Sequence, residues 1–262
     1  MEKLLDIVAR LRHPENGCPW DLQQTLSTIV PHTLEEIYEL IEAIEEGNST
    51  AVKDELGDVL FQVLLLSRIA EDEQLFTLND VVVNLCEKLV RRHPHVFTNQ
   101  KFGSASEHAM VWEEIKREER RVKQQAEVAD QSVLEGVSIA LPALVRAPKL
   151  QRRAAAVGFD WDNIESVFAK VEEEIAELKA ELATSGSKQR IEAEMGDILL
   201  ACSNLARHLE VDAEVALRKA NLRFETRFRY IETQLLAQGK EMNDVDLKGL
   251  EALWQSAKQQ EE

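Results

Sequence analysis

Two short acidic stretches decide the fold of this chain: Leu34-Glu35-Glu36-Ile37-Tyr38-Glu39 and, after a short gap, Glu55-Leu56-Gly57-Asp58. In helices, the carboxylates of each stretch are three or four positions apart and therefore share one edge. Like charges placed in this way repel one another. The pattern is unfavourable unless something positive lies between the two helices.

The same pattern occurs a second time. Glu173, Glu174 and Glu177 repeat the first stretch 138 positions later, and Glu194-Met195-Gly196-Asp197 repeats the second 139 positions later. A single acidic cluster on a helix is usually a solvated face. Two copies at an almost constant offset instead indicate that each half keeps a cation site made of oxygen ligands.

Composition narrows the class of protein. The chain has 262 residues, of which 44% are hydrophobic, and its Gly and Pro content is low, as helices require. A net charge of −17 argues against a nucleic-acid partner, because phosphate backbones are held by an excess of Lys and Arg. Any phosphate ligand must then come with a metal or meet a local basic group.

The cysteines and the N-terminus bear on the compartment. Cys18, Cys86 and Cys202 form neither a CxxC pair nor an even disulfide framework. The N-terminus is amphipathic and acidic, unlike a signal peptide, and no apolar run approaches the roughly 20 residues that span a bilayer. These features predict a soluble cytoplasmic protein with free thiols and no membrane partner.

Helical periodicity runs through the whole chain, so the predicted fold class is all-α. Thr33 is the predicted N-cap of the helix with the first acidic stretch, with Glu36 completing a capping box. The expected helices are 1–12, 34–46, 51–71, one from Thr77 or Asn79 to Pro94, 107–128, 163–184, 188–209, 212–238 and a short one after Asn243.

Breakers place a boundary between two domains. Gly136, Pro142 and Pro148 punctuate a segment after Asp130, and residues 157–162 echo the Gly-Cys-Pro-Trp-Asp of residues 17–21. We therefore expect a first domain at 1–122, a linker at 123–150 that packs against something, and a second domain at 151–262. Gly57 and Gly196 lie inside helices, where close approach of a neighbouring helix or of a ligand would exclude a side chain.

The chemistry of the acids favours magnesium. Hard divalent cations take oxygen ligands, and Mg²⁺ keeps positions for water and substrate phosphate. A zinc site would need His or Cys neighbours, and a di-iron bundle would need Glu-x-x-His pairs, which are absent here. We predict Mg²⁺, with Mn²⁺ as a substitute.

The acidic pattern resembles the all-α nucleoside triphosphate pyrophosphohydrolases of the MazG type. The resemblance covers nearly the whole chain and includes the stretches Gly17-Cys18-Pro19-Trp20-Asp21, Arg91-Arg92-His93-Pro94-His95-Val96-Phe97, Val157-Gly158-Phe159-Asp160-Trp161 and Lys219-Ala220-Asn221-Leu222-Arg223-Phe224. It implies two tandem helical bundle domains, each completed by pairing in a homodimer. It also implies a nucleoside triphosphate substrate such as ATP.

The resemblance assigns metal ligands in both halves. One carboxylate in each cluster, the first Glu of the pair, would orient the attacking water instead of binding metal directly. The implied ligands are Glu35, Glu36, Glu39, Glu55 and Asp58 in the first half and Glu173, Glu174, Glu177, Glu194 and Asp197 in the second.

Cations downstream of the acids are the expected phosphate contacts. Arg223 and Arg227 lie one helical turn apart. Family members commonly have Lys where Arg223 stands, so a planar guanidinium replaces an ammonium point charge at this phosphate contact. Lys88 and Arg92 have the same spacing in the first half, although they also suit the negative end of a helix dipole. Asn221 is expected at sugar or base. The tail residues Trp254 and Lys258 are expected to close over the nucleotide, with ordinary core as the alternative for Trp254.

The implied reaction is attack of water on the α-phosphorus, giving nucleoside monophosphate and pyrophosphate, with Glu173, Glu174, Arg223 and Arg227 as catalytic residues. We expect broad specificity for ribo- and deoxynucleotides and the main activity in the second half, whose match is fuller. A narrow house-cleaning enzyme for one nucleotide, such as dUTP, is the first alternative. A non-catalytic helical scaffold that contacts a partner protein is the second.

Overall fold

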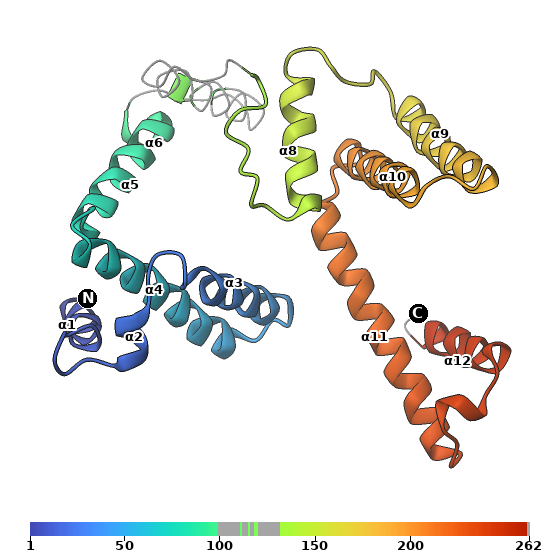
Figure 1. The fold of residues 1–262 in the computed structure, drawn as a ribbon, viewed down its shortest axis with the longest axis horizontal. Helices are drawn as coiled ribbons and strands as arrows, with labels where there is room; N and C mark the ends of the chain where they lie inside the picture. Colours follow the sequence, from blue (N-terminus) through green and yellow to red (C-terminus); the bar gives the residue numbers. More distant parts are fainter. Residues whose placement is uncertain (99–110, 112–114, 116–117, 120–131, 261–262) are drawn as a thin grey trace. The chain divides into compact units, whose positions relative to one another are not determined.

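The computed structural model describes residues 1–98, 111, 115, 118–119 and 132–260 (Figure 1). No strand occurs among these residues, and the secondary structure there is helical, which confirms the all-α class. The chain divides into two compact units, Met1–Glu119 and Arg120–Glu262, which are described separately below.

The first unit is built around a helical hairpin. Its helices are α1 (Glu2–Leu11), α2 (Pro19–Gln23), α3 (Val30–Glu45), α4 (Ser49–Asp72), α5 (Leu78–Arg92) and the single turn α6 (Pro94–Phe97). α3 packs along α4, and α1 and α5 also contact α4. Ile29, Leu65 and Ile69 are fully buried and form the core, with Phe61 packed against them. The hairpin therefore brings the two acidic stretches side by side.

The predicted start of the first acidic helix is wrong. α3 begins at Val30, with Pro31 in its first turn, and Thr33 lies inside the helix. The Thr33 hydroxyl lies 3.2 Å from the Ile29 carbonyl and 3.4 Å from Gln62 Oε1, either of which can accept its single hydrogen, so it caps nothing. Proline is favoured in a first turn because its missing N–H has no helical partner there. The capping box of this unit lies at α5 instead, between Thr77 and Asp80.

The second unit repeats the hairpin. Its helices are α8 (Ala143–Ala155), α9 (Ile164–Ala183), α10 (Lys188–His208), α11 (Ala213–Ala237) and α12 (Leu247–Gln259), with a 3₁₀ turn at Met242–Asp244. α9 packs along α10, α8 packs on α10, and α12 folds back on α11. The second pair of acidic stretches therefore also faces across a hairpin (Figure 1).

Helix α8 begins inside the segment expected to link the domains. Pro142 is its N-cap and Pro148 lies within it. A proline inside a helix removes one hydrogen bond, a cost of about 3 kcal/mol. The contacts of α8 with α10 and α11 offset that loss. This segment packs, as expected, but as a regular helix.

The two helical glycines have open space around them. A Cβ added to Gly57 or Gly196 would meet no atom within 4 Å, apart from the glycine's own helix. Close packing of another helix of this chain, the commoner of the two explanations, is therefore wrong for the described residues. The helix predicted at 107–128 lies largely outside those residues. No described helix is long and apolar enough to cross a membrane.

Candidate active site

Three carboxylates of the second unit converge across the α9–α10 hairpin. Oxygen atoms of Glu174, Glu194 and Asp197 lie within 4.8 Å of one another. The pKa of Glu194 is raised, first by burial of its carboxyl and then by the charges of Glu177 and Asp197. Such crowding is the environment in which a divalent cation replaces protons as the partner of the acids.

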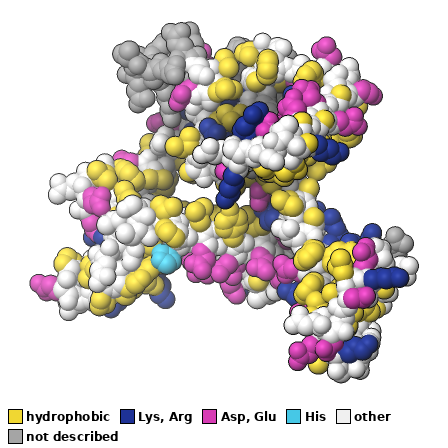
Figure 2. Space-filling model, turned by 45° about the vertical axis from the view of Figure 1, so that its right-hand side comes forward, with side chains coloured by type: hydrophobic (Ala, Val, Ile, Leu, Met, Phe, Trp, Pro, Cys, Tyr) yellow, Lys and Arg dark blue, Asp and Glu magenta, His cyan; other side chains and the backbone are white. Residues whose placement is uncertain are grey.

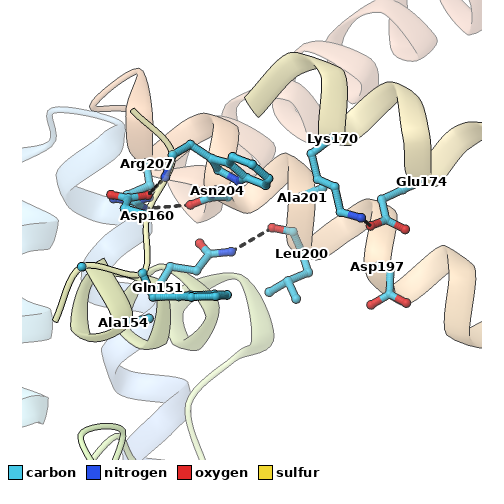
Figure 3. A pocket seen from close by; sticks show the side chains of 13 residues that line it. Gln151, Ala154, Asp160, Lys170, Glu174, Asp197, Leu200, Ala201, Asn204 and Arg207 are labelled. Atoms are coloured by element: carbon cyan, nitrogen blue, oxygen red, sulfur yellow. Dashed lines mark hydrogen bonds and ion pairs between the residues drawn. The ribbon is translucent and has the colours of Figure 1, made fainter. Parts of the chain in front are cut away.

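A lysine balances part of this charge. Lys170 Nζ lies 2.8 Å from Glu174 Oε1 and 2.9 Å from Glu173 Oε1 (Figure 3). These two bonds, that to Glu174 first, raise the pKa of Lys170 above its usual value. The Glu174 side chain is only 8% exposed, so its charge is neutralised inside the protein. Sequence inspection missed Lys170, although its position one turn before Glu174 was a usable signal.

The first unit holds the matching cluster with different neighbours. Oxygen atoms of Glu36, Glu55 and Asp58 lie within 4.8 Å of one another. The pKa of Glu55 is raised, first by burial and then by the charges of Glu39 and Asp58. In place of a lysine, the buried Gln62 donates from Nε2 to Glu36 Oε1 at 3.3 Å.

The remaining predicted ligands lie at the margin of the clusters. Glu39 and Glu177 act on the neighbouring acids only through their charge. Glu173 pairs with Lys170, and Glu35 lies 3.7 Å from His32 Nδ1. Glu35 and Glu173 are the carboxylates expected to orient water. Their place outside the three-oxygen groups is compatible with that role.

A pocket of about 390 Å³ opens beside the second cluster. Glu174 and Asp197 line it (Figure 3), and so do Phe159 and Trp161, whose side chains are exposed. The other side chains around it are mostly small, apolar or amide-bearing: Gln151, Ala154, Leu200, Ala201 and Asn204. An apolar concave site with a few polar groups is the usual form of a small-molecule site.

An ion-pair network forms the wall of the pocket away from the acids. The Arg207 guanidinium makes a two-nitrogen contact with the Asp160 carboxylate, with Nη1 at 3.0 Å, and His208 Nε2 lies 3.0 Å from Asp160 Oδ1. Arg207, foremost, lowers the pKa of Asp160 to about 2. The network ties the loop before α9 to the end of α10. Phe159 and Trp161 flank Asp160 in sequence, so the network anchors the backbone that carries them.

Asp160→Asn is expected to lower the melting temperature at pH 7 by a few degrees. Because the folded pKa of Asp160 lies below the ordinary value of about 3.9, its ion pair stabilises the fold above pH 4. That stabilisation is lost as the pH falls from about 4 towards about 2. Thermal unfolding of both proteins at pH 7 and in acid tests this, with the exposed Asp162→Asn as control. A gap that stays constant into acid would contradict it.

In the second half, the cations expected at the nucleotide lie on α11 and α12. Arg227 stacks on the Trp254 ring with 5.4 Å between Cζ and the ring centroid, and the ring of Phe224 also packs on Trp254 at 5.3 Å. Asn221, Arg223 and Lys258 are exposed. None of these side chains lines the pocket beside the acids. The structure thus gathers Arg227 with Trp254 but does not join them to the acid cluster within one chain.

In the first unit, Arg92 contacts a carboxylate. Arg92 Nη2 lies 2.6 Å from Glu119 Oε2, and Arg91 Nη2 lies 2.7 Å from Glu119 Oε1. These arginines, Arg92 foremost, lower the pKa of Glu119 to about 2. Lys88 is half-buried on the same helix. The phosphate role expected for Lys88 and Arg92 stays a prediction, with a partner for Arg92 that sequence inspection did not foresee.

A helical hairpin with a carboxylate triplet on its facing helices, present twice, defines an all-α protein with acid clusters that could hold a metal ion. Comparison with known proteins gives the family. Residues 24–97 match the family model of the MazG nucleotide pyrophosphohydrolase domain. The nucleoside triphosphate pyrophosphohydrolase of Escherichia coli is 48% identical over 262 residues, covering 100% of this chain and 98% of that protein.

A second relative comes from Thermotoga maritima. Its nucleoside triphosphate pyrophosphohydrolase/pyrophosphatase MazG is 41% identical over 98% of this chain and 95% of its own length. The crystal structure of a mazG-related protein from the same organism is 30% identical, covers 45% of this chain and 99% of that one, and has a TM-score of 0.39. The chain belongs to the MazG family of nucleotide pyrophosphohydrolases. This membership confirms the resemblance and the enzyme class that it implied.

Proposed function

We propose that this enzyme hydrolyses nucleoside triphosphates to nucleoside monophosphate and pyrophosphate with Mg²⁺, mainly in its second half. The observation that carries the proposal is the continuity of the second cluster with a pocket: Glu174 and Asp197 line the same cavity as Phe159 and Trp161. A triphosphate at the acids would then place its nucleoside among the rings.

The residues at the cluster fit a hard divalent cation. Glu174, Glu194 and Asp197 offer three oxygens within 4.8 Å of one another, and no His or Cys belongs to the group. They would hold Mg²⁺, with Mn²⁺ as a substitute. Such an ion supplies charge neutralisation at the phosphate oxygens and a more acidic bound water. Burial and then the charges of Glu177 and Asp197 raise the pKa of Glu194, and a bound cation would relieve this repulsion between the acids.

The chain's own groups would divide the remaining work. Glu173, at the margin of the cluster, would orient the attacking water towards the α-phosphorus. Lys170 holds Glu173 and Glu174 in place through its two ion pairs. Arg223 and Arg227 would stabilise the charge that develops on the departing pyrophosphate.

The first unit keeps the acids but has larger, buried side chains at two positions equivalent to ones that line the pocket. With the offset of 139 residues between the two Gly-Asp pairs, Gln62 stands where Ala201 stands and Leu65 where Asn204 stands. Gln62 is 4% exposed and bonded to Glu36, and Leu65 is completely buried. We propose that these side chains occupy, in the first unit, the space that would be open to a nucleoside in the second. The first unit is therefore proposed to bind metal without turning over nucleotides efficiently.

We further propose a homodimer. Exposed apolar side chains lie along both hairpins and along α11, and Figure 2 shows hydrophobic side chains in many places on the visible face. Examples on three helices are Leu56 and Leu60, Leu199 and Leu200, and Leu222 and Phe224. Pairing of two chains would cover such faces. It would also allow Arg223 and Arg227 of one chain to reach the acids of the other.

Two alternative hypotheses compete with this proposal. A house-cleaning enzyme for one nucleotide, such as dUTP, would use the same acids with a more selective pocket. A non-catalytic scaffold would keep the acids for a structural cation or for none. Turnover of the eight common nucleotides with Mg²⁺ separates the first of these from a broad enzyme.

The purified protein is expected to release pyrophosphate, and no orthophosphate, from nucleoside triphosphates. Attack at the α-phosphorus leaves the β- and γ-phosphates joined, whereas attack at the γ-phosphorus would free orthophosphate. Ion chromatography of the products, with Mg²⁺ and with EDTA, distinguishes the two outcomes. Orthophosphate as the sole product would eliminate the proposed reaction.

A further inference from the structure

One polar atom in the pocket is left without a partner. Gln151, on α8, donates from Nε2 to the Leu200 carbonyl on α10 at 3.0 Å (Figure 3). Because only the amide nitrogen can donate to a carbonyl, this bond distinguishes Nε2 from Oε1 of Gln151. The other end, Oε1, is buried and accepts no hydrogen bond from any residue that the structure describes. Buried acceptors are almost always paired in folded proteins, so an unpaired one on a side chain that lines a pocket is a candidate partner for a donor on a ligand.

The surroundings of Gln151 suit a flat apolar ring. Ala154, Leu200 and Ala201 line the same pocket, and the rings of Phe159 and Trp161 are 79% and 46% exposed beside it. Aromatic side chains left open at a cavity are typical stacking partners for a nucleobase. The charges near Gln151 do not favour binding of a second anion in the pocket, because Asp160 already neutralises Arg207.

A second amide at the pocket has a fixed orientation as well. Asn204 Oδ1 accepts a hydrogen bond from Arg207 Nε at 2.9 Å, so the nitrogen of this amide remains to donate. The pocket thus presents an acceptor at Gln151 and a donor at Asn204. A nucleobase carries the complementary pair, an N–H beside a carbonyl or ring-nitrogen acceptor, on its Watson–Crick edge.

We propose that Gln151 Oε1 accepts a hydrogen bond from an N–H group on the edge of the substrate's base. This inference rests on the proposed function, since it takes the triphosphate to lie at the acid cluster. It makes Gln151 a specificity-determining residue of a particular kind. Adenine, cytosine, guanine, uracil and thymine all carry an N–H on this edge, so one acceptor admits every common base. The same acceptor disfavours a base that has no N–H on this edge.

A pair of nucleotides that differ only in this donor tests the proposal. Purine riboside triphosphate is ATP without its amino group, and it leaves the Gln151 oxygen buried and unpaired. The enzyme is expected to use ATP with a kcat/KM at least about tenfold higher than the analogue. In Gln151→Leu, which has similar volume and no acceptor, the ratio is expected to fall to about one, mainly through loss of activity with ATP.

The same comparison with CTP and its analogue that lacks the 4-amino group extends the test to pyrimidines. Gln238→Leu, at the exposed C-cap residue of α11, is the matched control and should keep the wild-type ratio. Thermal unfolding checks that losing the bond to Leu200 leaves the fold intact. A purely structural role of Gln151 would lower activity on both members of each pair equally and leave the ratios unchanged, which would overturn the proposal. Absence of pyrophosphate from every nucleotide with the wild-type protein would instead overturn the proposed function.

Discussion

Glu174→Gln is expected to reduce pyrophosphate release by about a thousandfold or more, and Asp197→Asn to do the same. Glu174 is nearly buried, and it contributes an oxygen both to the three-carboxylate group and to the ion pair with Lys170. An amide in its place removes one negative charge from the proposed metal site and leaves the Lys170 ammonium with Glu173 alone. Interactions with charge that develops in a transition state are worth about 10²–10³ in rate for a single neutral donor, and loss of a metal ligand costs more.

The first unit supplies the matched control for this experiment. Glu36→Gln makes the same change at the same place in the other hairpin, where Gln62 bonds to the acid. It is expected to change the rate by less than about twofold. Binding of Mn²⁺ to each variant, measured by calorimetry, should show one site lost in either case. If Glu36→Gln abolished turnover and Glu174→Gln did not, the assignment of activity to the second half would be reversed. If neither substitution changed turnover, the result would support the hypothesis of a non-catalytic scaffold.

The acid clusters were predictable because their signal is local. Two carboxylates three positions apart on a helix share an edge in any fold. The loop of a few residues between α3 and α4, and that between α9 and α10, then fixes an antiparallel hairpin. The duplicated pattern therefore predicted which helices face one another. In the structure, three acids of each set of five have oxygens within 4.8 Å of one another, and Glu173 is not among them; the metal-binding role of all five stays a prediction.

The pocket was not predictable, because it is assembled from segments that sequence spacing cannot relate. Gln151 lies on α8, directly after the segment that Pro142 and Pro148 marked as a linker. Its tether to Leu200 spans 49 positions, and the bond of Asp160 to Arg207 spans 47. No helical period connects such pairs. The start of α3 was missed for a different reason: Pro31 was not recognised as a first-turn residue.

Ala201→Gln is expected to lower kcat/KM for ATP by about a hundredfold while leaving the metal site able to bind Mn²⁺. The reason is already present in the first unit, where Gln62 occupies the equivalent position, is buried, and donates to Glu36. A glutamine at position 201 would fill the pocket between the acids and the rings and could bond to Glu174 in the same way. Glutamine is a good helix former, so α10 itself should remain intact.

Ala201→Ser is the control, because a serine at this position leaves the pocket nearly as large as alanine does. The loss in Ala201→Gln should appear for every nucleotide, since the whole nucleoside is displaced, and this separates it from the base-dependent effect at Gln151. Pyrophosphate release near the wild-type rate from Ala201→Gln would mean that the nucleoside does not enter this cavity. In that case Gln62 and Leu65 of the first unit could no longer support the proposal that the two sets of carboxylates differ in activity.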